Sequence, residues 1–454
     1  MRYWPVEALG HGTAEEEEHR IVEALLAGGD SRLLLDRRGV NKYLCPPIPA
    51  PAQACLSSCT ASPISNLGFL RASAVFQRVA AAPAVLEIRR IQDCAADNEA
   101  GIRLYLGLGR SGQVILTTSG TDGMLMAASL LALEAGERPM TAILPSPSET
   151  GTGVPLAASC HAFDGPEAGR SVIDVSVDTA HIALRGSDGK PRETGAVTEE
   201  FRDAVRASRG RPVVILTHGT KTGLVAPVEV PAGVEVIVDA CQLRLSPSRI
   251  RNYLTRGWPV VITASKFLGG PAFSGAVLLP AGRFSAGVCK RARAVCARLG
   301  GLAGTGSSAA ASIGPLLRWS AALAEFDGAA LPEDQVAEGL RRFEREAAAV
   351  VAALPGARVI DQPAGCPGIV TFAVEAAGLA GSWLSVAQLR QIYRGLADQA
   401  VLVGQPVDLG PFGGLRVAIG MRDIVRGSSE ASLQRLAGAW PRAVGQGASR
   451  AKAA

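Results

Sequence analysis

A single lysine follows an apolar stretch of the sequence that predicts a buried strand. Residues 260–265 read Val-Val-Ile-Thr-Ala-Ser, and Lys266 comes directly after them. An amine in a desolvated place has a lowered pKa, and its neutral form is a nucleophile toward carbonyl compounds. The alternative is that the long side chain carries its ammonium group to solvent and takes no part in chemistry.

A carboxylate ends a second predicted strand in the same way. Residues 234–238 read Val-Glu-Val-Ile-Val and lead to Asp239. In open α/β sheets, ligands bind beyond the carboxyl ends of the strands, where a buried carboxylate needs a cationic partner. A strand-end aspartate can also be a structural cap or a metal ligand. No cluster of carboxylates or histidines stands beside this one, so we expect no metal.

A short polar turn joins a third predicted strand to a helix. Ser119, Gly120 and Thr121 lie between an apolar stretch and an Ala- and Leu-rich stretch that begins near Thr121. The N-terminus of a helix presents unpaired N–H groups and the positive end of its dipole, so such a turn can bind phosphate. It has neither the lysine of a P-loop nor the spacing of GxGxxG, and alone it indicates only a helix start.

The composition is that of a large globular protein that acts on small molecules. The chain has 454 residues, 48% of them hydrophobic and 19% charged, which allows an extensive core and more than one lobe. A net charge of +5 without basic runs argues against nucleic acid as a partner. No apolar run is long enough to span a bilayer, and four glutamates stand where a signal peptide is apolar, so we expect a cytoplasmic protein without membrane association.

The distribution of predicted elements indicates an α/β protein with a large, mostly parallel sheet and a smaller C-terminal α+β domain. The predicted strands are residues 113–118, 141–145, 171–177, 211–219, 234–240, 259–265, 275–280, 368–374 and 414–420, and helical stretches cover residues 288–299 and 335–354. We expect an N-terminal helical and extended segment that closes the active site (residues 1–105), a large α/β domain (residues 106–290), and a helical linker with the small domain (residues 291–454).

A phosphate-binding turn, a strand-end aspartate and a strand-end lysine, in that order, resemble the fold-type-I enzymes of pyridoxal 5'-phosphate (PLP). The finer similarity is to the class-V aminotransferase and cysteine desulfurase branch. The similar motifs are Ser-Gly-Thr-Asp-Gly (119–123), Val-Asp-Ala-Cys-Gln (238–242), Ala-Ser-Lys-Phe-Leu-Gly-Gly (264–270), Gly-Thr-Gly (304–306) and Gly-Leu-Arg-Val-Ala-Ile-Gly (414–420). The resemblance implies a PLP-transferase-like fold of the aspartate aminotransferase superfamily.

The same resemblance implies a role for each matching residue. Lys266 would hold PLP as an internal aldimine and then act as the base that moves the substrate Cα proton. Asp239 would keep the pyridine nitrogen protonated, and Gln242 would donate a hydrogen bond to the phenolic oxygen. The residues that would hold the phosphate are Ser119, Gly120, Thr121 and Ser265. Thr305 would reach the phosphate from the second subunit, which implies a homodimer with shared active sites.

The expected substrate is an amino acid, and its carboxylate would be held by Arg416. A guanidinium group binds a carboxylate with two parallel hydrogen bonds, which lysine cannot do. The alternative is a surface arginine on an edge strand. Asn41 and Tyr43 are candidates for substrate contact or, equally, turn residues. Lys221 stands where the family has a smaller polar residue, and it is either a second anchor for substrate charge or a solvated side chain.

Two departures from the family pattern bear on the reaction. No cysteine follows Cys366, whereas desulfurases of this branch carry a nucleophilic cysteine on a loop before the carboxylate-binding strand. The aromatic or histidine residue that covers the cofactor ring is also missing from residues 144–158, where Glu149 to Gly153 are left to cover it.

We therefore expect an enzyme, a lyase or transferase of amino acid metabolism, but not a cysteine desulfurase. It would form an external aldimine and a Cα carbanion, followed by elimination or replacement at the substrate side chain. The alternative is an aminotransferase, and a more remote one is a non-catalytic sensor that binds PLP.

Overall fold

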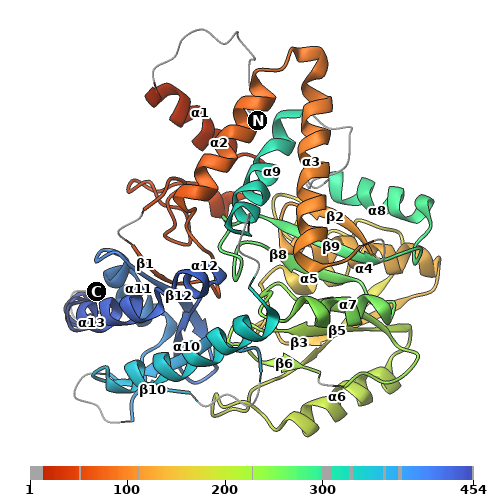
Figure 1. Ribbon diagram of the computed structural model, residues 1–454. Helices are drawn as coiled ribbons and strands as arrows, with labels where there is room; N and C mark the ends of the chain where they lie inside the picture. The colour runs from red at the N-terminus through yellow and green to blue at the C-terminus, as the bar shows by residue number, and fades with distance from the viewer. Residues whose placement is uncertain are drawn as a thin grey trace.

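The computed structural model describes residues 14–451 apart from 51–52, 110–111, 228, 299–308, 327–330, 361–364 and 377–380. The described chain forms an eight-stranded sheet and a five-stranded sheet. Each sheet is packed with helices, and the N-terminal helices stand together with α9 (Ala309–Leu323) at one end of the molecule (Figure 1).

The large sheet has the strand order β2-β9-β8-β7-β5-β3-β4, with β6 paired to β5. Its strands are β2 (Gly112–Thr117), β3 (Met140–Pro145), β4 (Val177–Ile182), β5 (Arg211–His218), β6 (Val225–Ala226), β7 (Glu235–Asp239), β8 (Val260–Thr263) and β9 (Gly275–Pro280). Neighbouring strands are parallel from β4 to β8, whereas β9 runs antiparallel to β2 and β8. The carboxyl ends of β2, β5, β7 and β8 therefore lie at one edge of the sheet.

Helices cover both faces of the large sheet. They are α3 (Ala84–Leu106), α4 (Gly120–Ala135), α5 (Val154–Ala158), α6 (Thr194–Ala207), α7 (Pro247–Thr255) and α8 (Ala286–Arg298). Successive strand residues point to opposite faces, so Ile237 shares a core with α4, α5 and α8, while Val236 and Val238 share one with α3 and α7. This three-layer packing holds the strand ends in fixed positions.

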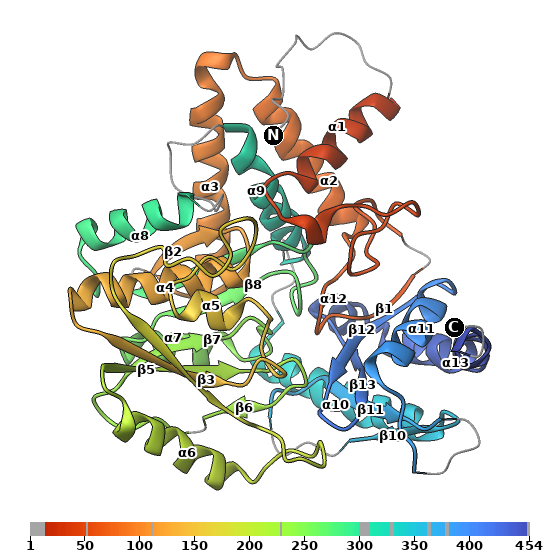
Figure 2. The same cartoon turned by 180° about the vertical axis from the view of Figure 1, so that it is seen from behind.

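The small sheet has the order β1-β12-β13-β11-β10, with β13 at its centre. Its strands are β1 (Ala54–Leu56), β10 (Ala357–Val359), β11 (Ile369–Val374), β12 (Val401–Asp408) and β13 (Gly413–Ala418). Around it lie α10 (Glu333–Ala353), α11 (Val386–Ala397), α12 (Met421–Arg426) and α13 (Ser429–Ala451) (Figure 2). β1 comes from the N-terminal part of the chain and pairs in parallel with β12, so the small sheet joins both ends of the chain.

A buried arginine ties the N-terminal segment to the rest of the molecule. The segment contains α1 (Ala14–Leu26), the 3-10 turn η1 (Ser31–Leu33) and α2 (Asn66–Ala80), while a second turn, η2 (Ala324–Phe326), follows α9. Arg318 on α9 donates to the carbonyls of Leu25 (2.6 Å), Ala27 (2.9 Å) and Phe273 (2.8 Å). These bonds satisfy carbonyls at the end of α1 and fix the start of residues 28–50.

Most predicted strands lie within two residues of their predicted bounds, but the one expected at residues 171–177 is wrong. The strand that pairs with β3 is β4, which begins at Val177, with Val177 opposite Met140. Val172, Ile173 and Val175 pack against the core from a bent segment instead. β4 is an edge strand, and an edge strand tolerates polar residues. A prediction based on apolar character therefore favours residues 171–177 over β4. The domain boundaries expected near residues 105 and 290 stay a prediction.

Candidate active site

A cleft of about 1390 Å³ lies at the carboxyl edge of the large sheet. It is bounded by the small sheet, by α11 and by residues 31–44 of the N-terminal segment. The lining includes nine of the predicted site residues, namely Asn41, Tyr43, Ser119, Gly120, Thr121, Asp239, Ser265, Lys266 and Arg416. Residues more than 350 positions apart in the chain thus share one cavity.

Lys266 lies on the tight turn that follows β8. Backbone bonds hold the turn on several sides: the Lys266 carbonyl accepts from the Ser62 hydroxyl (3.1 Å) and from the Gly269 amide (3.0 Å). The Phe267 carbonyl accepts from the Met421 amide (2.7 Å). Within the described residues, the Lys266 ammonium group forms no ion pair, and its side chain reaches the cleft. The amine is therefore accessible from the cleft and is not part of a structural ion pair within the described residues.

Asp239 is a buried carboxylate at the end of β7, with 7% of the residue exposed. Its Oδ1 accepts from the Cys241 amide (3.1 Å), which orients the carboxylate at the cleft wall. In the part of the chain that the structure describes, no lysine, arginine or histidine pairs with it. A buried carboxylate without a protein cation is suited to a ligand that carries a positive nitrogen.

The start of α4 forms the floor of the cleft beside these two groups. Ser119 is the N-cap: its Oγ accepts from the Asp122 amide (3.2 Å) and donates to the Asp122 carboxylate (2.6 Å). The amides of Gly120 and Thr121 have no acceptor within the helix because they belong to its first turn. A Cβ atom on Gly120 would lie 2.6 Å from Cys241 Sγ and 2.8 Å from Thr263 Cγ2, so any larger residue here would force these side chains to shift.

Two further predicted cofactor residues have different environments. Ser265 lines the cleft, and its hydroxyl donates to Thr263 Oγ1 at 3.4 Å. Gln242 is buried behind the lining: its Nε2 donates to the carbonyls of Cys59 (3.1 Å) and Thr220 (3.4 Å), while its Oε1 has no partner in the described structure. Thr305 lies outside the described residues.

Arg416 is buried on the central strand β13, with 3% of the residue exposed, so the alternative of a surface arginine on an edge strand is wrong. Its guanidinium donates to the carbonyls of Gln405 (2.7 Å) and Lys221 (2.7 Å) and to Thr60 Oγ1 (3.0 Å). No carboxylate of the described residues pairs with it. Neutral acceptors thus hold a full positive charge at the cleft, where a carboxylate ligand would compensate it.

The N-terminal segment places Asn41 and Tyr43 at the cleft in different ways. Asn41 Oδ1 accepts from the amides of Tyr43 (2.9 Å) and Cys45 (3.2 Å), the bonding of a turn residue. The Tyr43 carbonyl accepts from the Tyr393 hydroxyl of α11 (3.0 Å), and burial raises the pKa of the Tyr43 phenol. Asn41 therefore shapes the segment that brings Tyr43 to the cavity.

Arg32 and Lys221 also line the cleft. Arg32 is not among the site residues predicted from the sequence. It pairs with Asp30 at 2.6 Å, and its guanidinium lies 4.7 Å from the centre of the Phe273 ring. Lys221 is not simply solvated, because its Nζ donates to the carbonyls of Pro147 (2.9 Å) and Ser148 (3.3 Å). Burial, together with the nearby charge of Arg416, lowers the pKa of Lys221 to about 8.

The segment expected to cover a cofactor ring contributes two residues to the cavity, Gly151 and Thr152. Glu149 is turned into the protein, where it pairs with Arg185 (2.6 Å) and accepts from Thr222 Oγ1 (2.8 Å). Its carboxylate is therefore committed to structure and not to a ligand.

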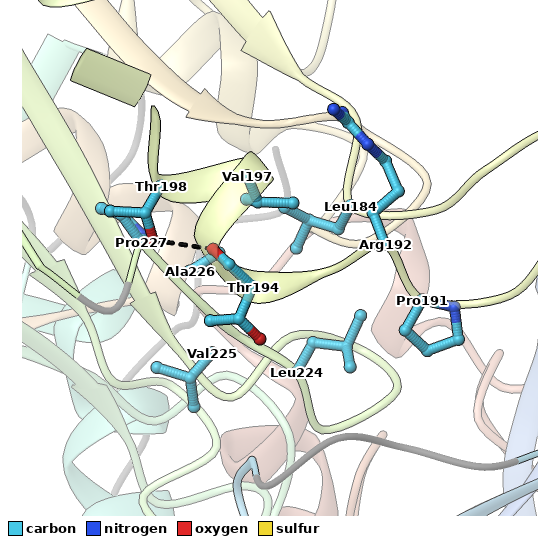
Figure 3. Close-up of a pocket in the computed structure, with 10 residues that line it drawn as sticks. All are labelled: Leu184, Pro191, Arg192, Thr194, Val197, Thr198, Leu224, Val225, Ala226 and Pro227. Carbon is cyan, nitrogen blue, oxygen red and sulfur yellow. Dashed lines mark hydrogen bonds between the residues drawn. The ribbon is translucent and has the colours of Figure 1, made fainter. Parts of the chain in front are cut away.

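A second pocket lies away from this chemistry, between α6 and β6 (Figure 3). It is lined by Leu184, Val197, Leu224 and Pro227 among others, and Thr198 Oγ1 donates to the Thr194 carbonyl beside it. Its volume of about 30 Å³ holds no more than one or two water molecules. The large cleft is therefore the better candidate for a substrate site.

The described residues contain neither a metal-binding cluster nor a membrane-spanning helix. No group of three or more His, Cys, Asp or Glu side chains in this part of the chain is arranged to hold a metal ion. None of the helices described here has the length and apolar character needed to cross a membrane.

No protein-family model matches the sequence, and no curated protein matches it. Solved structures match over most of its length. The cysteine desulfurase CsdA from Escherichia coli is 13% identical, and the match covers 87% of this chain and 95% of that one at a TM-score of 0.53. The cystine C-S lyase C-DES, solved with its reaction product cysteine persulfide, is 15% identical. This match covers 85% of this chain and 97% of that one, at a TM-score of 0.57.

A sphingosine-1-phosphate lyase from Burkholderia pseudomallei is 15% identical, with 88% of each chain covered and a TM-score of 0.51. Another structure of C-DES holds glycine covalently linked to its PLP cofactor. At these identities the likeness shows the fold. The chain has the fold of the PLP-dependent enzymes of fold type I, as in their class-V branch, which confirms the predicted fold class.

Proposed function

We propose that the protein is a PLP-dependent enzyme that acts on an amino acid by eliminating or replacing a group on its side chain. The observation that carries this proposal is the convergence of Lys266, Asp239 and the start of α4 on one cleft. These groups follow three separate strands of one sheet, and each offers what a different part of the cofactor requires.

The residues present fit PLP. Asp239 is a buried carboxylate that forms no ion pair within the described part of the chain, so it can accept a protonated pyridine nitrogen. The free amides of Gly120 and Thr121 and the Ser265 hydroxyl would hold the phosphate, and glycine at position 120 allows a close approach. Lys266 would hold the aldehyde carbon. The Ser119 hydroxyl is already committed to Asp122, so its contribution would come from its backbone amide.

When bound, PLP supplies an electron sink for negative charge at the substrate Cα. The chain's own residues would then position the substrate and move protons. Arg416 would bind the α-carboxylate, and Lys266 would take the Cα proton on Nζ and return a proton to the leaving group or the product. Tyr43 and Thr60 would close the cavity around the substrate.

The cysteines of the cleft support a reaction other than cysteine desulfuration. Cys59 and Cys241 line the cavity. Burial and the neighbouring Asp239 raise the pKa of Cys241 well above its ordinary value, and Cys59 is packed against Ile369 and Ala418 with 2% exposure. Sulfur abstraction requires an accessible thiolate: the raised pKa disfavours the thiolate at Cys241, and burial limits access to Cys59.

A homodimer is part of the proposal. Leu67, Leu70, Val85, Ile88 and Leu104 leave between 48% and 86% of their surface exposed on α2 and α3. Exposed apolar side chains on adjacent helices are typical of a surface that another chain covers. The second copy would bring its own Thr305 to the phosphate.

The test is turnover of a panel of amino acids by the PLP-loaded protein. Side-chain elimination predicts continuous release of a keto acid and a leaving group without a second substrate. An aminotransferase instead forms about one keto acid per site and stops until an acceptor keto acid is added. A protein that turns over no amino acid, either with or without an acceptor keto acid, contradicts the proposal.

A further inference from the structure

Lys221 is a cation held in place at the cleft wall, and no anion of the described residues forms an ion pair with it. Two of its three N–H donors are spent on the carbonyls of Pro147 (2.9 Å) and Ser148 (3.3 Å). The backbone is fixed as well, because the Lys221 carbonyl accepts from Arg416 (2.7 Å) and its amide donates to the Glu149 carbonyl (2.8 Å). One donor of a positioned ammonium group therefore remains for a ligand.

The cleft around Lys221 has more positive than negative charge available to a ligand. Eight lysines and arginines line it, among them Lys221, Lys266 and Arg416, against four aspartates. No carboxylate of the described residues forms an ion pair with any of these three cations. The acids that act on Lys221 are Glu149, which is committed to Arg185 at 2.6 Å, and Asp408, which accepts from the Gly410 amide (2.9 Å). Burial and the charges of Arg416 and Lys266 lower the pKa of Lys221, so the three cations are close enough to disfavour one another.

The proposed function accounts for two of these three cations. Lys266 would be engaged by the cofactor, and Arg416 by the α-carboxylate of the substrate. Lys221 is left over, and its mutual repulsion with Arg416 would be relieved by an anion between them. A hydroxyl or apolar side chain in the substrate would leave this charge uncompensated.

We propose that the substrate carries a second acidic group on its side chain, and that Lys221 binds it. The inference rests on the proposed function, since it assumes an amino acid in the same cleft. It names the substrate class as acidic amino acids, and Lys221 as the residue that distinguishes them from their neutral isosteres.

The experiment measures the binding of aspartate, asparagine, glutamate and glutamine to the PLP-loaded protein, from the change in the cofactor's absorption spectrum. The variants are Lys221→Met, Lys221→Arg and, as a control, Lys190→Met, whose side chain is 77% exposed and lies outside the cleft. The wild type should bind an acid more tightly than its amide. Lys221→Met should lose about 10- to 100-fold in affinity for the acid, the range of a charge-assisted hydrogen bond, and little for the amide.

Two patterns would overturn the inference. One is a wild type that binds the amides as tightly as the acids. The other is a Lys221→Met variant that weakens acid and amide equally, which would assign Lys221 to the α-carboxylate or to folding. Lys221→Arg should restore part of the preference for the acid, and Lys190→Met should leave it intact. Failure of the proposed function is distinct, because then no amino acid would alter the spectrum.

Discussion

The two walls of the cleft are built in different ways. On the large-sheet wall, Asp239 ends a strand, and Lys266 and the Ser119–Thr121 turn come within four residues of strand ends. On the opposite wall, the Tyr393 hydroxyl of α11 donates to the Tyr43 carbonyl, and Arg416 of the small sheet donates to Thr60 Oγ1 of the N-terminal segment. The geometry of the first wall is fixed by one packed sheet. The second wall, which we call the assembled wall, forms only when the N-terminal segment, α11 and the small sheet come together.

This difference predicts different responses to mutation. On the large-sheet wall, the loss of a functional group should remove chemistry and leave folding almost intact. On the assembled wall, the same positions serve both substrate binding and folding, so the two should fail together.

The largest effect is expected for Lys266→Ala. Loss of a proton-transferring base lowers turnover by about 10²- to 10⁴-fold, and loss of the covalent anchor weakens retention of PLP. Because the Lys266 amine makes no ion pair within the described structure, the melting temperature of the PLP-free protein should be nearly unchanged. Steady-state turnover and thermal unfolding measure the two quantities. Equal turnover in the variant and the wild type would remove Lys266 from the mechanism.

Arg416→Lys should impair both binding and folding. We expect KM for the amino acid to rise about 10- to 100-fold, because lysine cannot form the two-pronged bond. The buried carbonyls of Gln405 and Lys221 would also lose donors, which should cost about 1–3 kcal/mol of unfolding free energy. The matched control is Arg358→Lys, whose side chain is 70% exposed. An Arg416 variant with normal KM and normal stability would show that the assembled wall has no such double role.

Gly120→Ala tests the tight packing of the large-sheet wall. The new Cβ would lie 2.6 Å from Cys241 Sγ and 2.8 Å from Thr263 Cγ2. We expect a loss of about 1–3 kcal/mol in unfolding free energy from overpacking, together with weaker PLP binding. The control is Gly438→Ala on α13, where nothing lies within 4 Å and a gain of about 0.5–1 kcal/mol is expected. Chemical denaturation measures the unfolding free energy, and titration measures the affinity for PLP. A Gly120→Ala variant with both quantities unchanged would contradict this expectation.

The smallest effect is a pH dependence of the preference for acidic substrates. The pKa of Lys221 lies at about 8, set by burial and the neighbouring Arg416 and Lys266 against Glu149 and Asp408. Only the protonated amine attracts an anion, so the ratio of aspartate to asparagine affinity should be constant below pH 8. Above it, the ratio should fall by up to about tenfold per pH unit. A ratio that rises with pH, or that falls equally in Lys221→Met, would contradict this role.

Sequence and structure agree best on the residues that lie at strand ends and line the cleft. Lys266, Asp239 and Gly120 were located because an apolar stretch predicts a strand and its end predicts a ligand site. Agreement is weaker at the edge of the sheet: residues 171–177 are more apolar than β4, but the pairing with β3 selects residues 177–182.

The assembled wall was predicted only in part, because its properties depend on contacts between distant segments. Arg416 was singled out, yet its burial follows from the central position of β13, which the local sequence does not encode. Arg32 was missed because its place in the cleft depends on packing against Phe273, about 240 positions away. The backbone bonds of Lys221 to residues 147–148 were equally invisible in the sequence.

The measurement that tests the cofactor assignment most directly is borohydride reduction of the PLP-loaded protein, followed by mass mapping of its peptides. Three lysines line the cleft, Lys42, Lys221 and Lys266, which makes the site of labelling informative. We predict a visible absorption band that disappears on reduction, and a pyridoxyl mass on the peptide that contains Lys266. A label on Lys221 instead, or no label on a protein supplied with excess PLP, would contradict the assignment.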